Sequence, residues 1–116
     1  MRRRVLFVIA ADPRLSARPA EAIRIAAGVS AWQTVQVLVY LHGAAVLLLD
    51  PVAAVLVAGE EFGRYLPVLA EQGQPVRVQR AAPELLLLSE PLVPYEAIDA
   101  GAFAALLADC HSAVRF

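Results

Sequence analysis

The residue types best suited to nucleophilic or metal chemistry are scarce in this sequence, which contains one cysteine and two histidines. Cys110 and His111 are neighbours in a predicted helix, where adjacent side chains point about 100° apart, so they do not form a catalytic pair. These three residues are too few for a structural zinc site. The sequence also lacks lysine, a Walker loop and the glycine-rich dinucleotide motif. We therefore expect no metal, no cofactor and no Schiff-base chemistry.

Polar side chains that suit ligand binding follow the ends of three predicted strands. Ligands of parallel α/β sheets bind beyond the carboxyl ends of the strands, so these side chains are expected at one edge. His42 also suits a turn, Arg80 suits solvent, and Asp12 before Pro13 suits turn chemistry. The candidate ligand-binding residues are Asp12, Arg14, His42, Gly43, Gln79 and Arg80.

Cys110 ends a predicted helix, and helices in such folds run antiparallel to the strands. It is therefore expected at the edge opposite to the ligand-binding candidates. A free cysteine commonly serves as a small core residue, so we interpret Cys110 as half-buried and structural.

Short apolar runs alternate with helical patterns along the chain. Runs over 5–10, 35–41 and 76–79 predict buried strands, and 113–116 is long enough for a closing strand. Helical spacing with start and stop signals predicts helices over 17–31, from 59 to 73, and over 100–110. Residues 44–58 fit a strand, a helix or an apolar loop, and 85–88 fit a helical turn or a strand.

The alternation of strands and helices predicts the fold class. A strand, helix and strand of this length form the βαβ crossover of a parallel sheet. The sequence therefore predicts an α/β protein, a three-layer α/β/α sandwich with a mostly parallel sheet of about five strands and flavodoxin-like topology. A chain of 116 residues fits one domain, spanning residues 1–116.

The composition bears on partners and location. Hydrophobic residues make up 59% of the chain, more than a small monomer can bury, which favours a homo-oligomer. A net charge of −1 does not provide the excess of positive charge that nucleic-acid binding requires, so we expect no nucleic acid as a partner. The apolar stretch 37–59 is interrupted by His42, Asp50 and Pro51, and the run after Arg2–Arg4 is too short for a signal peptide, so we expect no membrane span. A single cysteine favours the cytoplasm.

The chain resembles the DsrE/DsrF family of small sulfur-relay proteins, especially its TusD-like members. The resemblance rests on the apolar opening 5–10, the run 37–43, Glu61-Phe62 opening a helix that ends at Gly73, and the segments 76–82 and 108–116. It covers nearly the whole chain. It implies the DsrE-like fold, a trimer or hexamer of identical chains, a cytoplasmic setting and a sulfur-relay partner protein.

One departure from the family pattern bears on activity. In active members the third strand ends in a cysteine that carries a persulfide, and the matching position here is Gln79. A carboxamide is not a nucleophile and cannot hold transferable sulfur, so no catalytic residue is expected there.

Three hypotheses follow from this departure. The leading one is a non-catalytic DsrE-like subunit, or a module that binds a small ligand or a protein. The alternative is a sulfurtransferase that carries persulfide on Cys110, with His42 or Arg80 supplied by another chain. The third is a pocket for a small anion or a nucleotide, formed by Arg14, His42 and Arg80.

Overall fold

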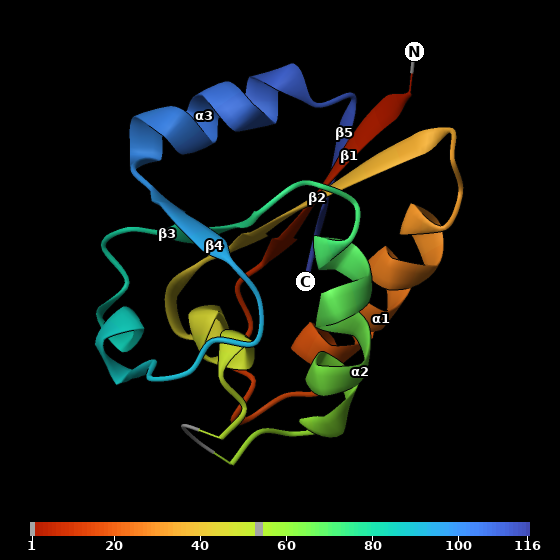
Figure 1. The fold of residues 1–116 in the computed structure, drawn as a ribbon. Helices are drawn as coiled ribbons and strands as arrows, with labels where there is room; N and C mark the ends of the chain where they lie inside the picture. Colours follow the sequence, from red (N-terminus) through yellow and green to blue (C-terminus); the bar gives the residue numbers. More distant parts are fainter. Residues whose placement is uncertain (1, 53–54) are drawn as a thin grey trace.

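The computed structural model describes residues 2–52 and 55–116, and these form a five-stranded sheet with helices on both faces (Figure 1). Each strand pairs in parallel with its neighbours. The strands are β1 (Arg3–Ile9), β2 (Val35–Leu41), β3 (Val76–Gln79), β4 (Tyr95–Ile98) and β5 (Ser112–Arg115). The helices are α1 (Arg18–Ser30), α2 (Glu60–Ala70) and α3 (Ala100–Asp109), with 3₁₀ helices η1 (Gly43–Leu49) and η2 (Pro83–Leu87).

The strand order is β4-β3-β2-β1-β5, so the chain winds outward from β1 in both directions. The predicted α/β sandwich with a five-stranded parallel sheet is confirmed. The order differs from the flavodoxin order 2-1-3-4-5, because here β5, rather than β2, flanks β1 on the outside. From β1 the chain adds β2, β3 and β4 on one side and then returns to add β5 on the other side of β1.

One face of the sheet is covered by α1, α2 and η1. Apolar side chains of β1, β2 and β3 pack there against Ile23, Phe62 and Leu66, each of which is fully buried. The helix predicted from 59 to 73 is confirmed as α2, in which Phe62, Leu66 and Leu69 recur at helical spacing and are all buried. On α1, Ala20 and Ala27 are buried, whereas Ala31, the last residue of the predicted helix 17–31, lies beyond α1 and is exposed.

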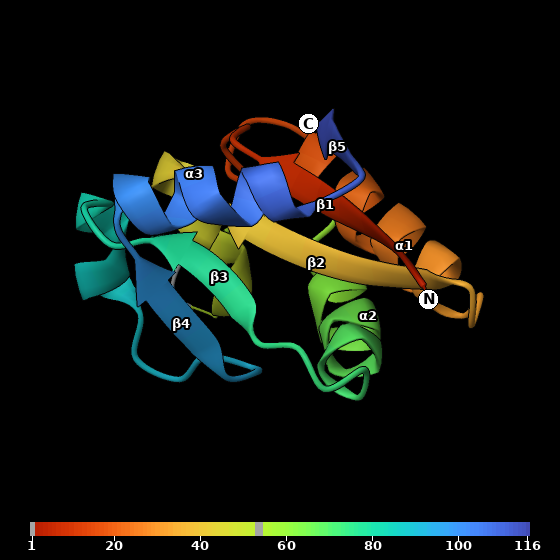
Figure 2. The ribbon, with the colours of Figure 1, turned by 90° about the horizontal axis from the view of Figure 1, so that it is seen from above.

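The other face of the sheet is covered by α3 (Figure 2). Leu6, Val8, Leu38 and Tyr40 are buried on this side, and Phe103 packs against them. No residue of α3 itself is buried, so the helix covers this face incompletely. Its outer side is formed by small side chains, namely exposed Ala102, Ala104, Ala105 and Ala108.

The ambiguous segments of the sequence become short helices and an additional strand. Residues 45–49 are fully buried in η1, so the first half of the apolar stretch 44–58 belongs to the core and does not form a surface. Residues 53 and 54 of that stretch lie outside the described part of the chain. Of the two alternatives for 85–88, the helical turn is the one found, since residues 85–87 lie in η2. Strand β4 follows at residues 95–98, which carry no clear strand pattern.

None of the helices that the structure describes is both long and apolar enough to cross a lipid bilayer.

Candidate functional site

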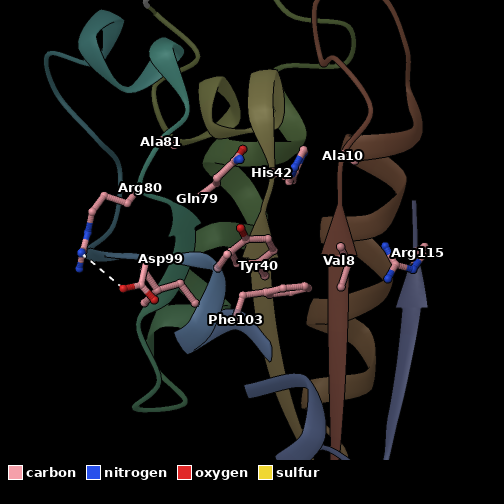
Figure 3. Close-up of a pocket in the computed structure, with 12 residues that line it drawn as sticks. Val8, Ala10, Tyr40, His42, Gln79, Arg80, Ala81, Asp99, Phe103 and Arg115 are labelled. Atoms are coloured by element: carbon pink, nitrogen blue, oxygen red, sulfur yellow. Dashed lines mark ion pairs between the residues drawn. The ribbon is translucent and has the colours of Figure 1, made fainter. Parts of the chain in front are cut away.

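A pocket of about 730 Å³ lies between α3 and the carboxyl ends of the strands (Figure 3). Its apolar lining consists of Val8, Ala10, Tyr40, Ala81, Ile98, Ala100 and Phe103. Its polar lining consists of His42, Gln79, Arg80, Asp99 and Arg115. The volume falls within the range of about 300–1,000 Å³ typical of small-molecule sites.

The register of the sheet explains why these side chains meet. Neighbouring residues in parallel strands point to the same face, and Val8 is paired with both Arg115 and Tyr40. Val76 and Val78 belong to the core on the α1 and α2 side, so Gln79 faces α3 by alternation. The pocket is thus formed by the last residues of several strands on the one face that α3 leaves partly open.

Gln79 ends β3, as predicted, and its side chain is held by the first residue of η1, which follows β2. The backbone N–H of Gly43 donates a hydrogen bond of 2.9 Å to its Oε1. Gly43 has a φ of +57°, a conformation that favours glycine and directs this N–H toward β3. The amide oxygen is therefore engaged, whereas Nε2 has no protein acceptor within the described chain.

Arg80 and Asp99 form one end of the pocket. The guanidinium of Arg80 donates a hydrogen bond of 3.2 Å to the Ala97 carbonyl, and lies 3.9 Å from the Asp99 carboxylate. Asp99 also accepts a hydrogen bond of 2.8 Å from the Ala102 N–H, so it caps α3. Both side chains are about two-thirds exposed, which leaves their ion pair screened by water.

Arg115 forms the opposite end of the pocket. It is the last residue of β5 and lies beside Val8 in the register (Figure 3). Among the described residues, no carboxylate lies within ion-pair distance of its guanidinium. Arg115 cannot be recognised as a site residue from the sequence, because a charged residue near the end of an exposed strand gives no signal of its own.

The base of the pocket is aromatic. The rings of Tyr40 and Phe103 stack with centroids 4.2 Å apart and planes inclined by 28°. Burial raises the pKa of the Tyr40 phenol, so the hydroxyl stays neutral at physiological pH. The two rings and Val8 make this part of the pocket apolar and supply no nucleophile.

Cys110 lies at the other end of α3, as the sequence predicted. The next residue pairs with the beginning of β1, where the Arg4 N–H donates to Nδ1 of His111 over 2.9 Å. The ten residues of α3 span about 15 Å, which separates the cysteine from the carboxyl edge of the sheet. Burial raises the pKa of the Cys110 thiol, which reduces the thiolate fraction at neutral pH.

Asp12 and Arg14 do not line the pocket. The Asp12 carboxylate accepts hydrogen bonds from the Arg14 backbone at 2.9 Å and from its guanidinium at 2.8 Å. These hydrogen bonds, that of the guanidinium first, lower the pKa of the Asp12 carboxyl. The pair forms the turn after β1, in agreement with the turn role considered for Asp12.

The pocket therefore combines three of the predicted residues with several that the sequence did not mark. His42, Gln79 and Arg80 line it, and Gly43 contributes through its hydrogen bond to Gln79. The missed polar residues are Asp99 and Arg115. Within residues 2–52 and 55–116 there is no group of three metal-ligating side chains, and the chain's single thiol lies outside the pocket.

Comparison with known proteins defines the fold. No family model matches the sequence, and no curated protein matches it. The structure superposes on a crystal structure described as the ychN protein from E. coli with a TM-score of 0.79 over 100% of both chains. The two sequences are 17% identical, so the likeness shows the fold alone, and this is the DsrE-like fold.

Proposed function

We propose that this chain is a non-catalytic DsrE-like protein that binds a small molecule reversibly in the pocket at the strand ends. The observation that carries the proposal is the identity of the residue at the carboxyl end of β3. Gln79 stands there, it lines the pocket, and its amide oxygen is bonded to Gly43. An amide can orient a ligand by hydrogen bonding, but it cannot attack one.

The position of the thiol supports reversible binding over sulfur transfer. A persulfide carrier needs a thiolate that donor and acceptor can both reach. Cys110 is partly buried, its pKa is raised, and it lies a helix length away from the pocket. The arrangement thus disfavours the alternative in which Cys110 carries the sulfur.

Ligand-detected and protein-detected NMR with a library of small fragments tests the proposal. Fragments are expected to shift the backbone amides of Arg80, Asp99 and Ala100, and to leave those of α1 unchanged. Ala81→Phe places a bulky ring in the pocket and should abolish these shifts. Ala31→Phe adds the same ring to an exposed position beyond α1 and is the matched control. A library that shifts no pocket amide in the wild type would contradict the proposal.

We further propose that identical chains associate, as trimers or hexamers, and that a sulfur-relay protein is a partner in the cytoplasm. The apolar outer side of α3 and the almost fully exposed side chains of Val52, Val55 and Leu86 support association. Light scattering after size-exclusion chromatography should give a mass of several chains, and a monomer at micromolar concentration would remove this part of the proposal.

A further inference from the structure

The charged groups of the pocket are divided between its two ends. Arg80 follows β3 and Arg115 ends β5, and these strands are three positions apart in the sheet. Neighbouring strands are spaced by about 4.8 Å, so the two backbone positions are about 14 Å apart. Figure 3 shows the two side chains on opposite sides of the Tyr40 and Phe103 rings.

Arg80 and Arg115 differ in whether a carboxylate of the protein already lies near the guanidinium. Arg80 lies beside the Asp99 carboxylate and donates to a backbone carbonyl. Arg115 has no carboxylate within ion-pair distance among the described residues, and its neighbour in the register is the apolar side chain of Val8. An anionic group of a ligand is therefore stabilised more at the β5 end than at the β3 end.

The N-terminus of α3 does not compete for that anion. The Asp99 carboxylate already accepts the Ala102 N–H there, and its negative charge repels a second anion. This argues against a nucleotide, whose phosphates would need several free N–H donors or cations in one place. A single guanidinium instead matches one carboxylate, which it binds through two parallel hydrogen bonds.

Between the two ends the pocket is lined by apolar side chains, and Gln79 offers it a hydrogen-bond donor. This apolar lining includes Val8 and the stacked rings of Tyr40 and Phe103. Beyond them, Nε2 of Gln79 has no protein acceptor within the described chain, because the bond from Gly43 uses the other amide atom. A ligand that spans this distance would receive a hydrogen bond from Gln79 at its end remote from Arg115.

From this distribution we infer that the pocket binds mainly apolar organic carboxylates, with the carboxylate at Arg115, the apolar body against the lining that includes Phe103, and a polar acceptor at Gln79. The inference rests on the proposed function, since it names the ligand class of the same pocket. It concerns the chemical class and the orientation of the ligand.

Matched probes test the class of ligand. Titration calorimetry would compare 2-naphthoate with neutral 2-naphthamide and with adenosine monophosphate. The carboxylate is expected to bind about tenfold more tightly than the amide, as a hydrogen bond to a charged partner is stronger than a neutral one. Raising the salt concentration should weaken the binding of 2-naphthoate and leave the binding of 2-naphthamide unchanged. A nucleotide that binds more tightly than the carboxylate would overturn the inference.

Variants of Arg115 test the orientation. Arg115→Gln should reduce the affinity for 2-naphthoate about tenfold, to that of the amide, and Arg115→Lys should retain part of it. Arg115→Glu should reverse the preference in favour of 2-naphthylmethylammonium. Arg24→Gln, an exposed position on α1, is the matched control and should bind like the wild type. Equal affinities for the wild type and Arg115→Gln would overturn the inference.

The fragment library separates this inference from the proposed function. If fragments shift pocket amides but carboxylates are not enriched among them, the inference fails and the proposed function stands. If no fragment shifts a pocket amide, both fail. Enrichment of carboxylates that disappears in Arg115→Gln supports both.

Discussion

The two faces of the sheet differ in how completely they are covered. On one face, α1, α2 and η1 bury a continuous apolar cluster that includes Phe62 and, from the buried run of η1, Ala45, Val46, Leu48 and Leu49. On the other, α3 lies across Leu6, Val8 and Tyr40 without burying any of its own residues. The first face stabilises the fold, and the second keeps space for a pocket where the strands end.

This difference shows how a small α/β chain can hold an accessible cavity without losing its core. Close packing on the α1 and α2 face supplies most of the buried apolar area. The α3 face is then free to use its aromatic and charged residues for a ligand. The predictions below test this division of roles between the two faces.

The largest effect is expected from a cavity in the closed face. Phe62→Ala should reduce the free energy of unfolding by about 3–5 kcal/mol, because the ring is fully buried and its neighbours cannot fill the space. Chemical denaturation followed by circular dichroism measures this loss. Phe103→Ala on the open face should cost about 1–2 kcal/mol, since Phe103 is only partly buried. Equal losses of unfolding free energy for the two variants would contradict the expected difference between the two faces of the sheet.

Acid should weaken the hydrogen bonds between Asp50, at the end of η1, and the segment that leads to β4. Asp50 is buried, and one of its oxygens accepts hydrogen bonds from the backbone N–H groups of Glu90 and Ser89 at 3.0 and 2.9 Å. These bonds, with that from Glu90 first, lower the pKa of the carboxyl. The stabilisation is therefore present above the ordinary carboxyl pKa and is lost as the pH falls through the lowered value.

Unfolding measured between neutral pH and about pH 2 checks this dependence. Asp50→Asn should lower the melting temperature at neutral pH and make stability less dependent on pH in the acid range. Glu96→Gln, at an exposed position of β4, is the control for the loss of one carboxylate. An unchanged acid dependence in Asp50→Asn would show that the contacts to Ser89 and Glu90 do not depend on the charge.

The thiol at the amino edge should react slowly. Burial raises the pKa of Cys110, so at pH 7 to 8 it alkylates more slowly than an exposed thiol. Mass spectrometry after timed exposure to iodoacetamide measures the rate. Ser112→Cys in a Cys110→Ser chain places a thiol at an exposed position nearby and should react faster. A reaction at Cys110 that is faster than that of the Ser112→Cys variant would support Cys110 as a candidate sulfur carrier.

The smallest effect is expected at the turn after β1. Arg14→Ala removes an exposed ion pair with Asp12 and touches no pocket residue. Ligand affinity should therefore be unchanged and the melting temperature nearly so. A clear loss of affinity in a calorimetric titration would place Arg14 in the site, as its position after a strand predicts from the sequence.

Much of the fold follows from local pattern, whereas the site depends on register. Continuous apolar runs predict β1 and β2 because both faces of these strands are buried, and the spacing of Phe62 and Leu66 predicts α2. β4 was missed because its sequence, Tyr-Glu-Ala-Ile, lies at an edge and is largely exposed. Its helical neighbour α3 was predicted at 100–110 from apolar spacing and ends one residue earlier.

The site could be predicted only in part for the same reason. His42, Gln79 and Arg80 directly follow or end strands, so the rule for parallel sheets places them together. Arg115 and Asp99 enter the pocket through the position of β5 beside β1 and of β4 beside β3, which no local pattern contains. Asp12 also follows a strand, but it lies in the loop after β1 and its hydrogen bonds to Arg14 keep it in its own turn.

The most direct test of the account compares the wild type with Gln79→Cys in a Cys110→Ser chain after exposure to a small-molecule persulfide. In the variant, the thiolate at position 79 attacks the outer sulfur of the donor and displaces the donor's thiolate, so the intact mass rises by one sulfur atom. The account predicts this gain for the variant and an unchanged mass for the wild type. A wild-type chain that takes up sulfur on Cys110, or a variant that takes up none, would contradict it.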